Sequence, residues 1–90
     1  MNILFLVIEK FKDTKEVYKR VREKGRMMPK GMTYVDSWVS LDGNTCWQIN
    51  DCENEEQLHE WVSHWKDVCD CECIPVITSH EMSEKMMNVK

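Results

Sequence analysis

The chain has 90 residues, of which 42% are hydrophobic and 31% charged, and its net charge is −4. This length fits one domain near the lower limit for a self-sufficient core, and the composition is that of a globular chain rather than a disordered one. The negative charge argues against nucleic acid as the main partner, because phosphate recognition needs clustered Lys and Arg.

The first two elements are predicted from an apolar run and a set of helix boundary signals. Residues 2–10 are rich in Ile, Leu, Phe and Val and predict a buried strand. Asp13 stands three residues before Glu16, which is typical of a helix N-terminus. The helix is expected to run to about Lys24, with Gly25 as its C-terminal cap.

The middle of the chain predicts a hairpin. Residues 33–41 and 45–51 read as two strands, and Asp42-Gly43 between them is a strong hairpin signal. Asn54, with Gln57 three residues later, then marks the start of a second helix. An apolar stripe at i, i+3, i+4 and i+7 gives that helix a core-facing side, formed by Leu58, Trp61, Val62 and Trp65.

The last strand is predicted over 70–78, and residues 79–89 predict a short helix with Met82, Met86 and Val89 on one side. The element order is therefore βαββαβ, which indicates an α+β, ferredoxin-like fold. We expect a four-stranded antiparallel sheet of order 4-1-3-2 with two helices on one face. Pro75 supports this order, because proline is tolerated on edge strands. The domain is expected to span 1–78, with a C-terminal tail over 79–90 that packs on a dimer.

Side chains alternate between the two faces of a strand, and the more apolar sets are expected to face the helices. On this basis Trp47, Cys71 and Cys73 face the helices with the two helix tryptophans. The opposite, open face is then expected to carry a mixed apolar and polar set: Ile3, Phe5, Val7, Glu9, Tyr34, Asp36, Trp38, Gln48, Glu72 and Ile74. Such a face is too apolar to be left in water, so we expect a homodimer whose two sheets face each other and enclose a partly polar cavity.

Three stretches carry a resemblance to a known family: LVIEKFKD, VYKRVREKGRMMPKGMTYVDSWV and WQINDCENEEQLHEWVSHWKD. They resemble the domain-of-unknown-function family 3303, a set of small, mostly bacterial proteins. The most specific piece leads from Gly25-Arg26-Met27 to Tyr34, Ser37 and Trp38. The resemblance covers about Leu4 to Val76 and leaves out the tail after Thr78. It implies the architecture of the dimeric α/β-barrel superfamily, which includes cofactor-free monooxygenases, haem-degrading enzymes, isomerases and ligand-binding modules, and it implies no particular reaction.

The candidate ligand-binding residues are the polar and aromatic members of the expected open face: Glu9, Tyr34, Asp36, Trp38, Gln48 and Glu72. A carboxylate in an apolar cavity has a raised pKa and can act as a general acid or base. Trp38 could stack on a planar ligand. The alternative is that these groups are structural, for example with Asp36 paired to Arg26.

The run VCDCECIPV, residues 68–76, raises the alternatives of a metal site or a thiol switch. Cysteines at i and i+2 of a strand are about 6.6 Å apart, too far for neighbouring zinc ligands or a disulfide. Cys71 and Cys73 are therefore expected in the core, and Cys69 is expected to be more exposed. His59 and His64 diverge on their helix, so no metal or cofactor is expected.

No secretory signal is recognisable, and the first apolar run is too short to cross a membrane. Five cysteines in such a chain indicate free thiols in a reducing cytoplasm. Three functions stay open: a small-molecule-binding protein or cofactor-free enzyme, a non-catalytic protein-interaction module, and a thiol sensor built on Cys69, Cys71 and Cys73. Whether the chain is an enzyme is left open.

Overall fold

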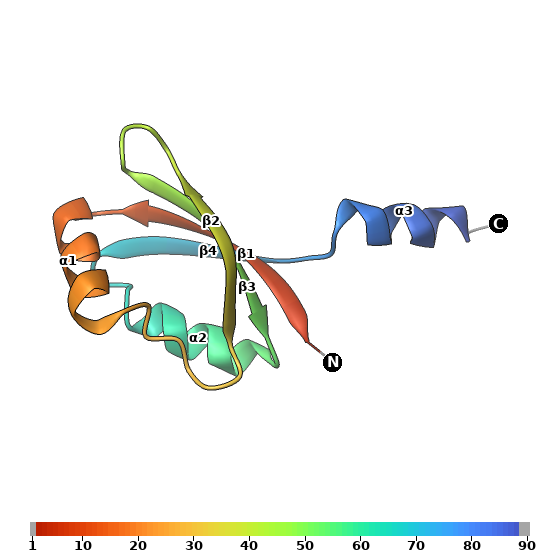
Figure 1. Ribbon diagram of the computed structural model, residues 1–90, viewed down its shortest axis with the longest axis horizontal. Helices are drawn as coiled ribbons and strands as arrows, with labels where there is room; N and C mark the ends of the chain where they lie inside the picture. The colour runs from red at the N-terminus through yellow and green to blue at the C-terminus, as the bar shows by residue number, and fades with distance from the viewer. Residues whose placement is uncertain (1, 89–90) are drawn as a thin grey trace.

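The computed structural model describes residues 2–88 and has the predicted element order, followed by a third helix (Figure 1). The strands are β1 (Ile3–Phe11), β2 (Thr33–Val39), β3 (Thr45–Cys52) and β4 (Cys69–Val76). The helices are α1 (Thr14–Lys24), α2 (Glu55–Ser63) and α3 (Ser79–Met87).

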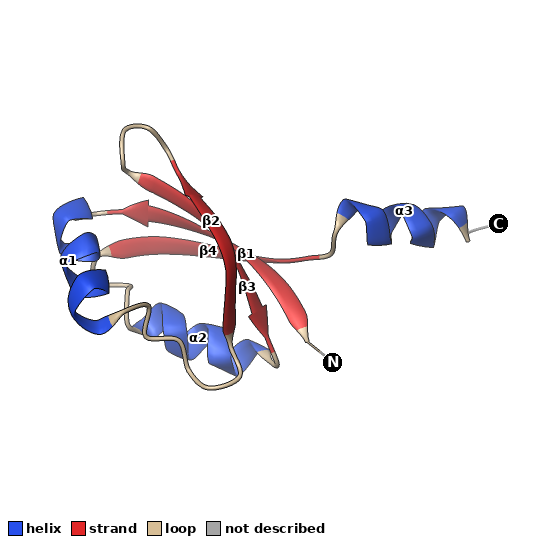
Figure 2. Cartoon of the chain, viewed as in Figure 1, coloured by secondary structure: helices blue, strands red, loops and turns tan. Residues whose placement is uncertain are grey.

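The four strands form one antiparallel sheet in the order β2-β3-β1-β4, and Figure 2 shows α1 and α2 on the same side of it. Read from the other edge, this is the predicted order 4-1-3-2, so the ferredoxin-like α+β fold is confirmed. Pro75 lies on β4, which is an edge strand as predicted.

The boundaries of α1 and α2 follow from the predicted capping residues. The Asp13 side chain accepts a hydrogen bond from the Glu16 backbone N–H at 3.1 Å, and Asn54 accepts one from the Gln57 N–H at 3.0 Å. Gly25 ends α1 with a φ of 67°, in the left-handed region that favours glycine.

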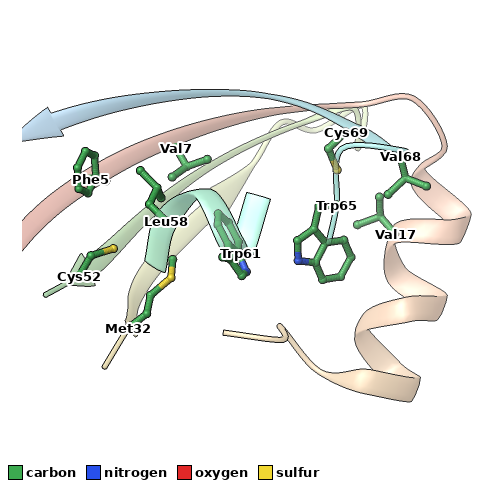
Figure 3. Close-up of a cluster of buried hydrophobic side chains, with 10 residues drawn as sticks. All are labelled: Phe5, Val7, Val17, Met32, Cys52, Leu58, Trp61, Trp65, Val68 and Cys69. Carbon is green, nitrogen blue, oxygen red and sulfur yellow. The ribbon is translucent and has the colours of Figure 1, made fainter. Parts of the chain in front are cut away.

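The hydrophobic core lies between the helices and the sheet (Figure 3). Leu58, Trp61 and Trp65 of the predicted stripe are all buried there. Ten buried side chains form the cluster: Phe5, Val7, Val17, Met32, Cys52, Leu58, Trp61, Trp65, Val68 and Cys69.

The predicted faces of β1 and β3 are wrong. Phe5, Val7 and Glu9 of β1 are buried on the helix side, and the register pairs Val7 with Gln48 and Glu9 with Cys46 on that same face. Because β1 is central, both of its faces are apolar, and its own pattern could not choose between them. Trp47 of β3 therefore lies on the open face opposite Trp38, not in the core, and is 38% exposed.

A β-bulge in β2 changes the face of one more predicted residue. The register shifts between Tyr34 and Asp36, so the strict alternation of side chains is broken at this point. As a result Tyr34 lies on the same face as Ser37, and their hydroxyl oxygens are 2.7 Å apart. Asp36 and Trp38 remain on the open face, as predicted.

The third helix extends away from the sheet (Figure 1), and none of its described residues is buried. Met82 and Met86 are exposed on it. Val89, which the sequence placed on the same side, lies outside the described residues. Within residues 2–88, no helix has the length and apolar character needed to cross a membrane.

Candidate functional site

A cavity of about 100 Å³ lies between the sheet and α1. Its polar and charged lining comes from Glu9 of β1, Ser37 of β2, Cys46 and Gln48 of β3, and Arg26 of the loop after α1. The rest of its wall is formed by Phe11, Val17, Tyr18, Val21 and Val39. The site is thus an apolar hollow with a few convergent polar groups, which is the usual make-up of a ligand pocket.

Glu9 is the most unusual residue of this cavity. It lies on the inner strand β1, only 9% of the residue is exposed, and Oε1 has no hydrogen-bond partner among the described residues. Burial raises the pKa of Glu9 to about 7, while the positive charge of Arg26 opposes part of that rise. A carboxyl group that titrates near neutral pH can act as a general acid or base.

Arg26 is held in place through its backbone. The indole N–H groups of Trp61 and Trp65 both donate to the Arg26 carbonyl oxygen, at 2.9 and 3.2 Å. Both rings come from α2 and its C-terminal turn, and Figure 3 shows them next to each other in the core. Gly25 before Arg26 and Met27 after it have φ values of 67° and 58°, in the left-handed region, so the chain turns tightly here. The two indole hydrogen bonds hold this loop at the cavity.

The Arg26 side chain makes two further contacts. It donates a hydrogen bond to Gln48 Oε1 at 3.1 Å, and its guanidinium carbon lies 3.7 Å from the centre of the Tyr34 ring. Gln48 in turn donates to Asn50 Oδ1 at 2.9 Å. Because arginine can only donate, this chain of bonds fixes the orientation of the Gln48 amide.

Glu9 and Arg26 face the same cavity without forming an ion pair. Their charges are close enough for Arg26 to lower the Glu9 pKa, yet no nitrogen–oxygen pair between them falls within 4.0 Å in the described part of the chain. A guanidinium and an unpartnered carboxyl group therefore lie near each other across a hollow. Both groups line the cavity and face any ligand that enters it.

Comparison with protein families identifies the family. The model of the domain of unknown function DUF3303 matches residues 3–90. The chain belongs to the DUF3303 family. The match includes α3, so the expectation that the tail lies outside the resemblance was wrong. None of the curated proteins and none of the solved structures matches the chain.

In this DUF3303 chain the six predicted site residues fall into two groups of three. Glu9, Tyr34 and Gln48 lie on the helix side with Arg26, where the structure brings them together. Asp36, Trp38 and Glu72 lie exposed on the open face.

Three residues in the polar and charged lining of the DUF3303 cavity were not predicted as site residues: Arg26, Ser37 and Cys46. One alternative in the sequence paired Arg26 with Asp36, but Arg26 lies over Tyr34 on the other face. The signal that could have found it is the segment Gly25-Arg26-Met27, the most specific part of the family resemblance.

The cysteines are all free. Cys69 is buried, contrary to the prediction that it would be more exposed. Burial and the nearby Glu9 charge raise the pKa of Cys46 to about 11 and of Cys69 and Cys71 to about 12. Their thiols stay protonated at neutral pH, which is the opposite of a reactive sensor thiol.

Outside this cavity, the described residues of the DUF3303 chain offer no metal site, and a larger hollow lies near α3. Residues 2–88 contain no group of three His, Cys, Asp or Glu side chains that could hold a metal ion. A larger but shallow hollow of about 560 Å³ lies where α3 leaves β4, lined by Ile3, Pro75, Val76, Ile77, Thr78, Ser79 and Met82. Among the described residues, its lining includes no titratable side chain.

Proposed function

We propose that this DUF3303 protein binds a small molecule in the cavity beneath α1, as a binding protein or a cofactor-free enzyme. The observation that carries the proposal is Glu9, a buried carboxyl group with an unpartnered oxygen that faces an apolar hollow. Leaving such an oxygen unpaired costs about 1–3 kcal/mol, and a ligand that donates to it would recover this energy.

The composition of the cavity supports general acid–base chemistry in particular. The pKa of Glu9 is raised to about 7, so the group both takes up and releases a proton near neutral pH. Arg26 supplies a positive charge for an anion that forms when a proton is lost. The cavity between the sheets of two protomers stays a prediction, because it requires a second copy.

Binding can be tested by filling the cavity. A set of neutral fragments of about 5–10 heavy atoms is added to the ¹⁵N-labelled chain, and amide chemical shifts are recorded. We expect at least one fragment to shift the amides of Glu9, Arg26 and Gln48. Val39→Trp, which fills the cavity from β2, should abolish this effect.

Val35→Trp is the matched control for that experiment. Val35 is on the same strand and exposed, but it does not line the cavity. The control variant should bind like the original chain. If no fragment shifts the cavity amides of the original chain, the proposed function is wrong.

We further propose that two copies associate through the open faces of their sheets. Trp38 is 58% exposed and lies opposite Trp47, and Ile8 pairs with Trp47 on the next strand. Neighbouring apolar side chains of this kind usually mark an interface. Asp36 and Glu72 lie on the same face and would form a polar part of it.

The dimer is expected to depend on Trp38. Tryptophan is often an interface hot spot worth about 2 kcal/mol or more, so Trp38→Lys should weaken association about 30-fold or more. Light scattering coupled to size exclusion measures the mass of each variant. Leu41→Lys, at the exposed hairpin, serves as the control and should leave the dimer intact. A monomeric original chain, or an unchanged Trp38→Lys dimer, would contradict this proposal.

A cytoplasmic location is also proposed. It is supported by five free cysteines, since a reducing compartment keeps thiols unpaired. The raised pKa values of the thiols argue against the thiol-sensor alternative.

A further inference from the structure

Glu9 and Arg26 present a carboxyl group and a positive charge to the same cavity, which suits a ligand oxygen that interacts with both. An oxygen that accepted from the guanidinium at about 2.9 Å and donated to the carboxylate at about 2.7 Å would connect the two groups. The described residues provide no such bridge, since Glu9 Oε1 has no partner and Arg26 bonds only Gln48 among the cavity side chains. A ligand oxygen that carries a proton in solution and a negative charge when bound can give its proton to Glu9 and place its charge beside Arg26.

We propose that the cavity takes a weak oxygen acid, a phenol or an enol with at most one small ring, and holds it as its anion opposite Arg26. This inference rests on the proposed function and adds the chemical class of the ligand. On binding, the O–H bond of the ligand breaks and its electron pair stays on the ligand oxygen. The proton forms a new O–H bond on Glu9 Oε1, so charge and atoms balance within the site.

The charges around Glu9 support this direction of proton transfer. Proton transfer converts a buried carboxylate into a neutral acid and places the new negative charge beside Arg26. The other titratable groups facing Glu9 are thiols and one phenol: Cys46 of β3, Cys69, Cys71 and Cys73 of β4, and Tyr18 of α1. Burial raises the pKa of each of these four thiols, so Arg26 is the only formal charge, among the described residues facing the cavity, that can balance the anion.

The size of the hollow sets the upper limit on the ligand. A closed apolar cavity of about 150 Å³ accommodates benzene. The present cavity is about 100 Å³, but Tyr18 and Val39 in its wall are 43% and 40% exposed and mark its opening to solvent. The expected ligand is therefore one small ring, with any substituent directed through this opening. Phe11 and Val17 supply the apolar contacts for the ring.

Binding of 4-nitrophenol tests the inference, because its anion is coloured and its neutral form is not. At pH values below the pKa of free 4-nitrophenol, adding the protein should convert part of it to the bound anion and so increase the absorbance of the anion. Above pH 7 the affinity for the anion should fall about tenfold per pH unit, because ionised Glu9 repels it. Glu9→Gln should remove this fall and bind the anion roughly 100-fold more tightly than the original chain at pH 9.

Arg26→Met is the second variant. It keeps the apolar stem and the backbone carbonyl that the two indoles hold, so the loop should stay folded, which circular dichroism checks. The absorbance change should be lost in this variant, while Val35→Trp should behave like the original chain.

The outcomes separate the ligand class from the proposed function. Unsubstituted phenol is tested beside 4-nitrophenol as the smaller probe. Binding of neutral 4-nitrophenol without an absorbance change overturns the inference. A fall in affinity for the anion above pH 7 that persists in Glu9→Gln also overturns it. If neither phenol binds but other fragments shift the cavity amides, the ligand class is wrong and the proposed function stands. If nothing shifts those amides, both are wrong.

Discussion

Replacing Glu9 with glutamine is expected to make the folded chain more stable, by about 3 kcal/mol at pH 8. The pKa of Glu9 is about 7 in the folded chain against an ordinary value of 4.5, because burial disfavours the charged form. At 1.36 kcal/mol per pKa unit, this rise corresponds to about 3 kcal/mol. Glutamine has nearly the same shape and carries no charge, so it removes the cost of burying the carboxylate.

The sign follows from proton linkage. Between pH 4.5 and 7 the folded chain binds the Glu9 proton more tightly than the unfolded chain, so stability falls as pH rises and stays low above pH 7. The gain from Glu9→Gln should therefore be only about 1 kcal/mol at pH 5 and reach about 3 kcal/mol at pH 8. Urea unfolding at both pH values, at one protein concentration, measures this difference.

Glu23→Gln is the control, since Glu23 is exposed on α1. Its effect should stay within about 0.5 kcal/mol at both pH values. If Glu9→Gln changed stability equally at pH 5 and pH 8, Glu9 would not be a buried carboxyl group of raised pKa. If Glu9→Gln is more stable than the original chain, the chain keeps this carboxyl group at a cost in stability, as functional sites commonly do.

Local signals in the sequence were sufficient for the fold. Caps at Asp13 and Asn54 and the turn at Asp42-Gly43 gave the element order, and Pro75 gave the edge strand. Each of these signals depends on only a few neighbouring residues, so it can be recognised without knowledge of the tertiary structure.

The site was predicted only in part, because it depends on which face each strand turns to the helices. Glu9 and Gln48 look too polar for a core, and the apolar pattern of a central strand fits either face. Cross-strand pairing holds the missing information: Val7 lies opposite Cys73, which was correctly expected to face the helices. Tyr34 could not have been placed by alternation at all, because the bulge after it leaves no clear signal in the sequence.

The second large effect concerns the two tryptophans that hold Arg26. Trp61 is 3% exposed, so Trp61→Ala should lower the free energy of unfolding by about 3–5 kcal/mol through lost packing. Trp61→Phe keeps most of the ring and removes only one of the two donors to the Arg26 carbonyl. Its cost should be about 1–2 kcal/mol, because the carbonyl still accepts from Trp65.

A double-mutant cycle of Trp61→Phe and Trp65→Phe isolates the shared acceptor. Either single variant leaves the Arg26 carbonyl with one indole donor, whereas the double variant removes both. We therefore expect the double variant to lose about 1 kcal/mol more than the sum of the single losses. Strict additivity would mean that the carbonyl finds another partner and that the indoles contribute only packing. Because the same carbonyl anchors the loop that carries the Arg26 side chain, the double variant should also weaken binding of the 4-nitrophenol anion more than either single variant does.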